Sequence, residues 1–276
     1  MCSFKQLSKI VTFTQLKPPP YKLISKTALN IQAGKKGGQA IIKKYGHIPV
    51  TEKYRQQQWN RWWQNIGQFK PLPSPDKPVC IPRKSALLAE FVGIMLGDGG
   101  ISNYHISVTL HASDDAEYAE YVAGMMQKLF SVRPSVYKKK QANALTIVIS
   151  RKILVKFLVS LGLPQGNKIA KGLTVPDWIQ NSDNFRKACL RGLFDTDGSV
   201  YRHRYRSKDK EYSYIKIGFS SVSPTLLQQV VTLLDQEGIA VTKNHNSIAI
   251  ESRLGVENFR HRIGFRNKKH LKRLCR

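Results

Sequence analysis

Apolar residues recur with helical spacing in two segments of the chain that end in the same way. The first predicted helix covers residues 86–96 and the second covers 184–196, and an aspartate and a glycine follow within three residues of each end. The glycine occupies the position at which helices commonly stop. After the first helix the pattern changes to strict alternation, with Ile106, Val108 and Leu110 on one side and polar residues on the other. This alternation predicts antiparallel strands with one buried face and one polar face.

The same order of elements occurs twice: helix, two strands, helix, two strands, helix. Asp98 recurs 99 residues later as Asp197, and Ser150 recurs 102 residues later as Ser252. Agreement of these landmarks predicts a duplicated unit of about a hundred residues. We therefore expect an α+β fold with two pseudo-symmetric αββαββα halves, in which helices lie behind antiparallel sheets.

The domain organisation predicted from the chain has three parts: an extension over 1–83, a first half over 84–176 and a second half over 177–276. Proline clusters interrupt the basic extension, and the second cluster is expected to act as a linker. Two stretches of the extension predict short helices, and the second of them contains Trp59, Trp62 and Trp63. Such a segment can stack on bases and contact phosphates as an accessory DNA-binding segment. Alternatively, its tryptophans can dock on the main domain.

The charge balance narrows the class of partner. Forty-five Lys and Arg residues stand against 18 Asp and Glu, which gives a formal net charge of +27. This charge is spread over the whole chain, so a nucleic acid is the first candidate partner. The alternatives are a highly solvated surface and attraction to acidic lipids. No apolar run reaches the ~18 residues of a membrane span. The four cysteines are isolated, so we expect a reduced intracellular protein, cytoplasmic or organellar and not secreted.

The two repeated aspartates are the candidate catalytic groups. Small residues four apart lie on one face of each helix and predict a close helix–helix interface, formed by Gly93, Gly97, Gly192 and Thr196. The pseudo-symmetry then brings Asp98 and Asp197 together at the same end. One Asp-Gly pair alone is usually only a turn or a helix stop. Asp195 is the weaker candidate because its counterpart in the first copy is Leu96.

That end of the helices is unfavourable for anions, since helix C-termini carry partial negative charge and two neighbouring carboxylates repel. We therefore expect a compensating cation. Mg²⁺, with Mn²⁺ able to substitute, fits carboxylate and backbone carbonyl ligands, here Asp98, Asp197, Gly97 and Thr196. A metal there can activate water and stabilise the oxygens of a phosphodiester during cleavage.

At these residues the sequence resembles the LAGLIDADG homing endonucleases in the single-chain form with two motifs. The two copies are "FVGIMLGDG" (Phe91 to Gly99) and "LRGLFDTDG" (Leu190 to Gly198), and the resemblance covers about Arg83 to Arg276. The first copy departs from the signature at positions 95 to 97. The resemblance implies saddle-shaped sheets over the DNA major groove, with the motif helices presenting the aspartates to the scissile phosphates across the minor groove.

In this family, basic residues near the active centre polarise water or the phosphate. The comparable residues here are Lys168, with Lys171 as second choice, and in the second half Lys268 or Lys269. Simple neutralisation of phosphates is the alternative role. Base recognition is expected from the polar sheet faces, and the candidate DNA-binding residues are His105, Ser107, Thr109, Lys138, Lys140, Arg202, Arg204, Arg206 and Lys216. Some of these charges can instead serve only to protect strand edges.

The sequence therefore predicts a monomeric, site-specific, Mg²⁺-dependent endonuclease that cuts double-stranded DNA, free-standing and intron-encoded. The alternative is an intron maturase that binds RNA, or a DNA-binding regulator on the same scaffold that does not cut. Such relatives can lose the acidic residues, so the presence of both Asp98 and Asp197 favours the nuclease.

Overall fold

The computed structural model describes residues 12, 13, 15, 17, 25–46, 51–69, 78–139 and 142–275. The chain forms two compact units, Met1–Pro73 and Ser74–Arg276. The second unit begins earlier than the predicted boundary at residue 83. Residues just before this boundary already belong to it, because the backbone N–H of Cys80 donates to the carbonyl of Phe130 at 3.0 Å. The division of the rest at residue 176 stays a prediction.

The described part of the first unit contains the helices α2 (Lys26–Tyr45) and α3 (Glu52–Asn65) and the 3₁₀ turn η1 (Gly67–Phe69). The side chains of Ser25 and Thr51 cap the N-termini of the two longer helices. Within α3 the rings of Trp59 and Trp63 stack with their centroids 5.6 Å apart. Neither helix has a buried residue in the part that the structure describes.

The second unit contains the predicted repeat. Its first half consists of α4 (Ala86–Gly97), β1 (Gly99–Ile101), β2 (Ile106–His111), α5 (Ala116–Phe130), β3 (Ser135–Lys139), β4 (Ala144–Ile149), α6 (Lys152–Ser160) and α7 (Lys168–Lys171). After α8 (Asp177–Gln180), the second half consists of α9 (Asp183–Thr196), β5 (Gly198–Ser207), β6 (Lys210–Ser220), α10 (Pro224–Gln236), β7 (Thr242–Lys243), β8 (Ser247–Ile250), α11 (Arg253–Arg262) and α12 (Lys268–Leu274).

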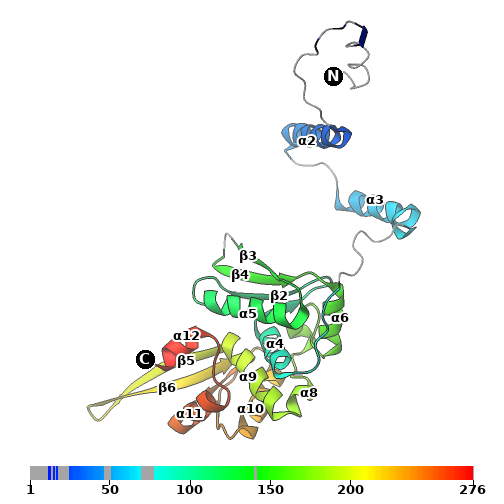
Figure 1. Ribbon diagram of the computed structural model, residues 1–276. Coiled ribbons are helices and arrows are strands. Elements are labelled where there is room, and N and C mark those ends of the chain that lie inside the picture. The colour runs from blue at the N-terminus through cyan, green and yellow to red at the C-terminus, as the bar shows by residue number, and fades with distance from the viewer. Residues whose placement is uncertain are drawn as a thin grey trace. The chain divides into compact units, whose positions relative to one another are not determined.

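The two halves share one sheet topology. The strand order is β1-β2-β4-β3 in one sheet and β5-β6-β8-β7 in the other, and all neighbouring strands are antiparallel. Figure 1 shows α4 and α9 between the two sheets. This arrangement confirms the predicted α+β fold with two equivalent halves.

The alternation predicted for the strands is also present. Ile106, Val108 and Leu110 on β2 are buried, while the residues between them are half-buried or exposed. Helices cover the buried face, and the core runs continuously through both halves because α4 and α9 belong to it. Among the residues that the structure describes, no helix combines the length and the apolar character required to span a bilayer.

The glycines after the motif helices do not stop them in the predicted way. The C-caps are Asp98 and Asp197, with φ of −89° and −93°, and neither Gly99 nor Gly198 has a positive φ. Both glycines instead begin a strand that passes close to the preceding helix. A Cβ on Gly198 would lie 2.9 Å from the Cα of Phe194. The glycines thus stand where predicted, directly after the C-caps, but close backbone approach and not a left-handed conformation explains them.

Candidate active site

The helices α4 and α9 touch along their backbones. A Cβ on Gly93 would lie 3.0 Å from the carbonyl carbon of Cys189, and one on Gly192 would lie 2.9 Å from the backbone nitrogen of Ile94. At the ends of the helices, Gly97 meets the side chain of Thr196. The four small residues of the predicted interface therefore all lie where the two helices meet.

One ion pair joins the same two helices. Arg191 on α9 donates to Oε2 of Glu90 on α4 at 3.0 Å, and the hydroxyl of Tyr121 donates to Oε1 at 2.6 Å. Arg191 also donates to the carbonyl of Ile263 at 2.8 Å. Glu90 is only 3% exposed, so this pair fixes the relation of the two halves with a directional contact inside an otherwise small-residue interface.

The contact between α4 and α9 places the two motif aspartates together. Oδ2 of Asp197 lies 3.2 Å from the position that a Cβ on Gly97 would occupy, so this carboxylate lies against the end of the neighbouring helix. Burial raises the pKa of Asp197 to about 6, and the negative charge of Asp98 adds to the increase. Burial likewise raises the pKa of Asp98. Two carboxylates thus share a poorly solvated position.

Lys168 is held at the same place. Its Nζ donates to the carbonyls of Leu96 at 3.0 Å and Gly99 at 3.1 Å, and also to that of Gly97. The ammonium therefore neutralises the negative C-terminal end of α4. Burial lowers the pKa of Lys168, while the charges of Asp197 and Asp98 oppose this decrease. Part of the expected cationic compensation is thus a side chain of the protein itself.

Burial is the main cause of the raised pKa of Asp197, and the charge of Lys168 offsets this increase only in part. In the described part of the chain no three His, Cys, Asp or Glu side chains form a metal-binding cluster. Mg²⁺ commonly uses only one or two carboxylates and completes its shell with water or substrate phosphate, so the two aspartates are a sufficient set of protein donors for it. The residues present are therefore suited to a divalent cation.

Two polar groups of the predicted metal-binding residues, the backbone carbonyl of Gly97 and the hydroxyl of Thr196, have partners within the protein. The carbonyl of Gly97 accepts from Lys168, and Oγ1 of Thr196 donates to the carbonyls of Gly192 and Leu193, both at 3.0 Å. The hydroxyl of Thr196 therefore belongs to its own helix. Metal ligation by Gly97 and Thr196 stays a prediction.

The two candidate lysines of the second half differ in position. Lys268 forms an ion pair with Glu117 and its side chain is 63% exposed, so its amine is engaged by a surface carboxylate. Lys269 forms a 2.8 Å ion pair with Asp115, and its charge lowers the pKa of Asp98. The geometry thus favours Lys269 over Lys268 as the counterpart of Lys168.

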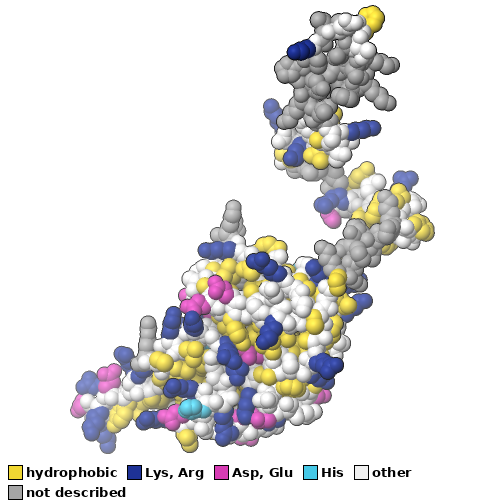
Figure 2. All heavy atoms as spheres, in the orientation of Figure 1, with side chains coloured by type: hydrophobic (Ala, Val, Ile, Leu, Met, Phe, Trp, Pro, Cys, Tyr) yellow, Lys and Arg dark blue, Asp and Glu magenta, His cyan; other side chains and the backbone are white. Residues whose placement is uncertain are grey.

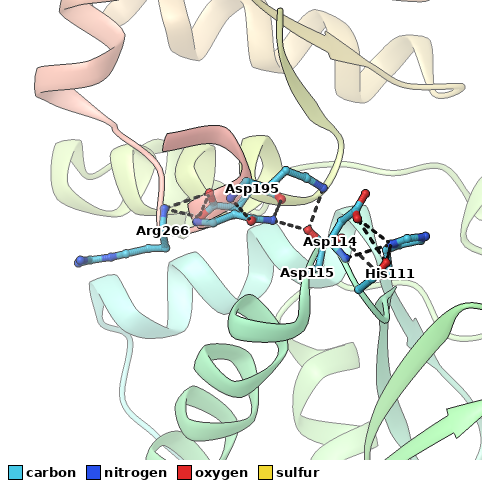
Figure 3. A network of polar contacts seen from close by, with 8 residues as sticks. His111, Asp114, Asp115, Asp195 and Arg266 are labelled. Atoms are coloured by element: carbon cyan, nitrogen blue, oxygen red, sulfur yellow. Dashed lines mark hydrogen bonds and ion pairs between the residues drawn. The ribbon is translucent and has the colours of Figure 1, made fainter. Parts of the chain in front are cut away.

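Asp195 belongs to a polar network beside the site (Figure 3). Its carboxylate accepts from the backbone N–H groups of Arg266 and Asn267 at 3.0 Å. Burial raises the pKa of Asp195 to about 7, against the lowering effect of these hydrogen bonds. Asp195 therefore fixes the loop before α12, which the sequence did not indicate.

The polar face of the first sheet carries part of the predicted DNA-binding set. Ser107 and Thr109 alternate with the buried residues of β2, and Thr109 shares a 3.3 Å hydrogen bond with Thr146 on β4. His105 lies in the turn before β2. Lys138 pairs with Leu145 and therefore lies on the opposite, core-side face near the sheet edge. Lys140 is outside the described residues.

The long β5–β6 ribbon divides the remaining candidates between its two faces. Arg202 pairs with Ile215, Arg204 with Ser213 and Arg206 with Glu211. Paired residues share a face, so the three arginines lie on the face of buried Val200 and Ile217. They do share one face, as predicted for a regular strand. Lys216 lies on the other face, where it forms a 2.5 Å ion pair with Glu251.

The face of the ribbon that carries Lys216 is rich in aromatic residues from both β5 and β6. The sequence alone did not predict them as DNA contacts. The aromatic members of this face are Tyr201, His203, Tyr205, Tyr212 and Tyr214, which we call the aromatic face. The rings of Tyr205 and Tyr212 stack with centroids 5.0 Å apart. The alternation along β6 places Tyr212 and Tyr214 on the same face as Lys216, so the sequence could have indicated them. The aromatic residues of β5 could not be found in this way, because their face depends on how β5 pairs with β6.

Comparisons with known proteins bear on the second half of the chain and on the fold. Residues 184–275 match the family model described as a LAGLIDADG-like domain. The curated relatives include a DNA polymerase of Thermococcus kodakarensis, 24% identical over 143 residues that cover 45% of this chain and 8% of that protein. They also include the ATP-dependent DNA helicase Hel308 of the same organism, 26% identical over 164 residues, or 59% of this chain and 14% of the helicase. The chain spans at most a fifth of the curated relatives it matches.

Similar solved structures include the homing endonuclease I-DmoI in complex with DNA and Mn, with 17% sequence identity, a TM-score of 0.44, and coverage of 65% of this chain and 96% of that chain. Full-length DUF199/WhiA from Thermatoga maritima is also similar, with 18% identity, a TM-score of 0.45, and coverage of 71% and 62%. The family model extends over α9, which carries the second motif segment. The family model bears out the resemblance to the LAGLIDADG family over residues 184–275, the second half of the repeat.

Proposed function

We propose that the protein is a site-specific endonuclease that hydrolyses phosphodiester bonds in double-stranded DNA with divalent metal ions, Mg²⁺ first and Mn²⁺ as a substitute. One observation carries this proposal. Asp98 and Asp197, from different halves, lie together at the touching ends of α4 and α9, each with a raised pKa. Such a pair is costly for folding alone, which favours a function that requires it.

The surrounding residues support the same role. The two carboxylates are the groups that would hold the metal, which when bound would activate water and stabilise the attacking and leaving oxygens. Lys168 lies close enough for its charge to act on both aspartates, so it adds positive potential that favours the approach of a phosphate. Because both aspartates belong to one chain, a monomer supplies the complete pair.

DNA binding is supported by charge and by shape. The net charge is +27, and Figure 2 shows Lys and Arg side chains spread over the visible face with few acidic ones. The polar faces of two antiparallel sheets offer side chains at strand spacing, which suits the major groove. Ser107, Thr109 and the aromatic face are the proposed contacts with bases, and Arg202, Arg204 and Arg206 are proposed contacts with phosphates.

A randomised double-stranded DNA library, incubated with and without Mg²⁺ and sequenced at the new ends, tests the proposal. We expect a defined cut site in Mg²⁺ only. Asp98→Asn and Asp197→Asn should abolish cutting and leave DNA affinity largely intact, because each removes one charge from the metal site. Asp235→Asn, an exposed position on α10, is the matched control and should cut normally.

Other outcomes point to different functions. Wild-type activity in either aspartate variant would refute the assignment of the site. A protein that binds DNA or intron RNA tightly and cuts neither would be the non-cleaving regulator or maturase that the scaffold also allows.

A further inference from the structure

The two aspartates of the proposed site have unequal surroundings, although the halves are equivalent in fold. The charges that act on Asp197 are those of Asp98 and Lys168. Those that act on Asp98 are Lys168, Asp115 and Lys269. Asp98 therefore has a second lysine nearby, supplied by the other half of the chain, together with an acidic residue outside the motif. The geometry agrees, because Lys269 and Asp115 form an ion pair and Asn267, two residues before Lys269, is bound to the carbonyl of Asp195 near the end of α9.

The backbone around this second lysine is fixed by Asp195 and Asn267. The Asp195 carboxylate binds the N–H groups that precede α12, as described above. Asn267 is 1% exposed, and its Nδ2 donates to the backbone carbonyl of Asp195 at 3.1 Å. Its Oδ1 accepts from the backbone nitrogen of Lys269 at 3.0 Å and caps α12. The start of α12 is thus tied to the end of α9.

Asp115 then determines where the amine of Lys269 lies. Asp115 stands at the start of α5 in the first half and is 6% exposed. Its Oδ1 lies 2.8 Å from Nζ of Lys269 and accepts from Nδ2 of Asn267 at 2.8 Å. Figure 3 shows Asp115 between the Asp195 group and the loop that carries His111 and Asp114. The carboxylate therefore joins the two halves at the site.

The first half lacks this arrangement in the part of it that the structure describes. Leu96 occupies the position of Asp195, and the side chain of Asn167 accepts only from the backbone of its own helix. Lys168 is held by the carbonyls at the end of α4 instead of by a carboxylate. The halves thus hold their lysines by different means, one through the helix end and the other through Asp115.

We propose that Asp115 is a positioning residue that holds Lys269 beside Asp98, and that this pair serves the cleavage of one particular DNA strand. The inference rests on the proposed endonuclease function. Lys168 acts near both aspartates and serves both strands. The network of Asp195 and Asn267 contributes by fixing the backbone of Lys269.

The test measures the two nicking rates separately. A supercoiled plasmid carrying the selected cut site, in Mg²⁺, is incubated with wild-type protein, Asp115→Asn, Lys269→Met and Lys168→Met, and each strand is followed with its own end label. The Asp115→Asn substitution keeps an oxygen for Asn267 but removes the charge that binds Lys269. Lys128→Met, on the exposed surface of α5, is the charge-matched control.

We expect Asp115→Asn and Lys269→Met to slow the same strand by about 100-fold while the other strand keeps its wild-type rate, so that nicked plasmid accumulates. Lys168→Met should slow both strands. Lys269 is partly exposed, so its variant decides the question even if Asp115→Asn does not fold. A general loss of stability cannot produce strand-selective slowing.

The possible results distinguish a failure of this inference from a failure of the proposed endonuclease function. Equal slowing of both strands by Lys269→Met, or strand-selective slowing by Lys268→Met instead, overturns the role of Asp115 and Lys269 while the endonuclease stands. Wild-type protein that nicks neither strand overturns the endonuclease and this inference with it.

Discussion

Gly93 of α4 faces the backbone carbonyl of Cys189 on α9, with no space between them for even a methyl group. Gly192 has the same relation to Glu90 in the opposite direction. Because the obstacle is backbone on a neighbouring helix, it cannot move aside as a flexible side chain could. The closeness of the two helices, and with it the distance between the aspartates, therefore depends on these glycines.

Gly93→Ala is expected to destabilise the protein by about 1–3 kcal/mol or more, because the added methyl group forces the helices apart. The measurement is the free energy of unfolding in urea. Gly124→Ala is the matched control, since a Cβ there meets nothing within 4 Å on helix α5. That variant should gain about 0.5–1 kcal/mol from the helix propensity of alanine. Equal stability of the two variants would contradict the close packing.

Asp197→Asn should change the pH dependence of stability. The pKa of Asp197 is about 6 in the folded protein against an ordinary value of 3.8, so the unfolded chain loses this proton at lower pH than the folded chain. The stability that protonation of Asp197 contributes is therefore fully present below pH 3.8 and is lost as the pH rises towards about 6, the pKa in the folded protein. Asp197→Asn has no carboxyl group at this position and does not lose this contribution. The melting temperature of the variant minus that of the wild type should therefore increase between about pH 4 and pH 7. A difference that stays constant over that range would count against the burial of Asp197.

Divalent cations should stabilise the protein without any DNA present. At pH 7, adding Mg²⁺, Mn²⁺ or Ca²⁺ is expected to raise the melting temperature, because a ligand that binds only the folded state shifts the equilibrium towards it. Asp98→Asn should remove most of this increase, and Asp235→Asn should keep it. The increase should shrink at pH 5, where protons compete for the same carboxylates. An increase of equal size in the Asp98 variant would place the cation elsewhere.

DNA affinity should fall steeply with salt. Each neutralised phosphate contributes a slope of about −0.9 in a plot of log affinity against log salt concentration. Fluorescence anisotropy with DNA that carries the selected cut site gives this slope for the wild type and for Arg204→Ala. The slope of the variant should be less steep by about one unit, because one phosphate contact is removed. A flat salt profile would argue for a different ligand.

The two faces of the β5–β6 ribbon should contribute differently. Tyr205→Ala, on the aromatic face, is expected to change which bases are tolerated in the cut site, because this face carries the proposed base contacts. Arg204→Ala should weaken binding to all sequences about equally. Repeating the library selection with both variants tests this difference. The reverse pattern would show that the arginine face lies in the groove.

The elements of the second unit were predictable because their signals are local. The alternation on β2 predicted which face of the strand is buried, and the repeated Asp-Gly pairs predicted that the unit has two equivalent halves. The close contact between α4 and α9 could be predicted because residues as small as Gly93 and Gly192 permit two helices to approach closely.

The identity of the second-half lysine was not predictable in the same way. Lys268 and Lys269 are neighbours with identical side chains, and their directions depend on how α12 begins. That start is fixed by Asp195 and Asn267, through contacts across more than seventy residues of chain. Likewise, the faces of Arg202 and Lys216 depend on the pairing register of a long ribbon, which alternation within one strand does not determine.

The ion pair of Glu90 and Arg191 has a consequence for the symmetry of the target. Ninety-nine residues separate the motif copies, so the counterpart of Glu90 is Cys189 and the counterpart of Arg191 is Val92. Two identical first halves would bring two glutamates to this junction with no arginine, and neither half can replace the other. For the proposed endonuclease, halves that are not interchangeable give no reason to select a palindrome, and the two arms of its recognition site are free to differ.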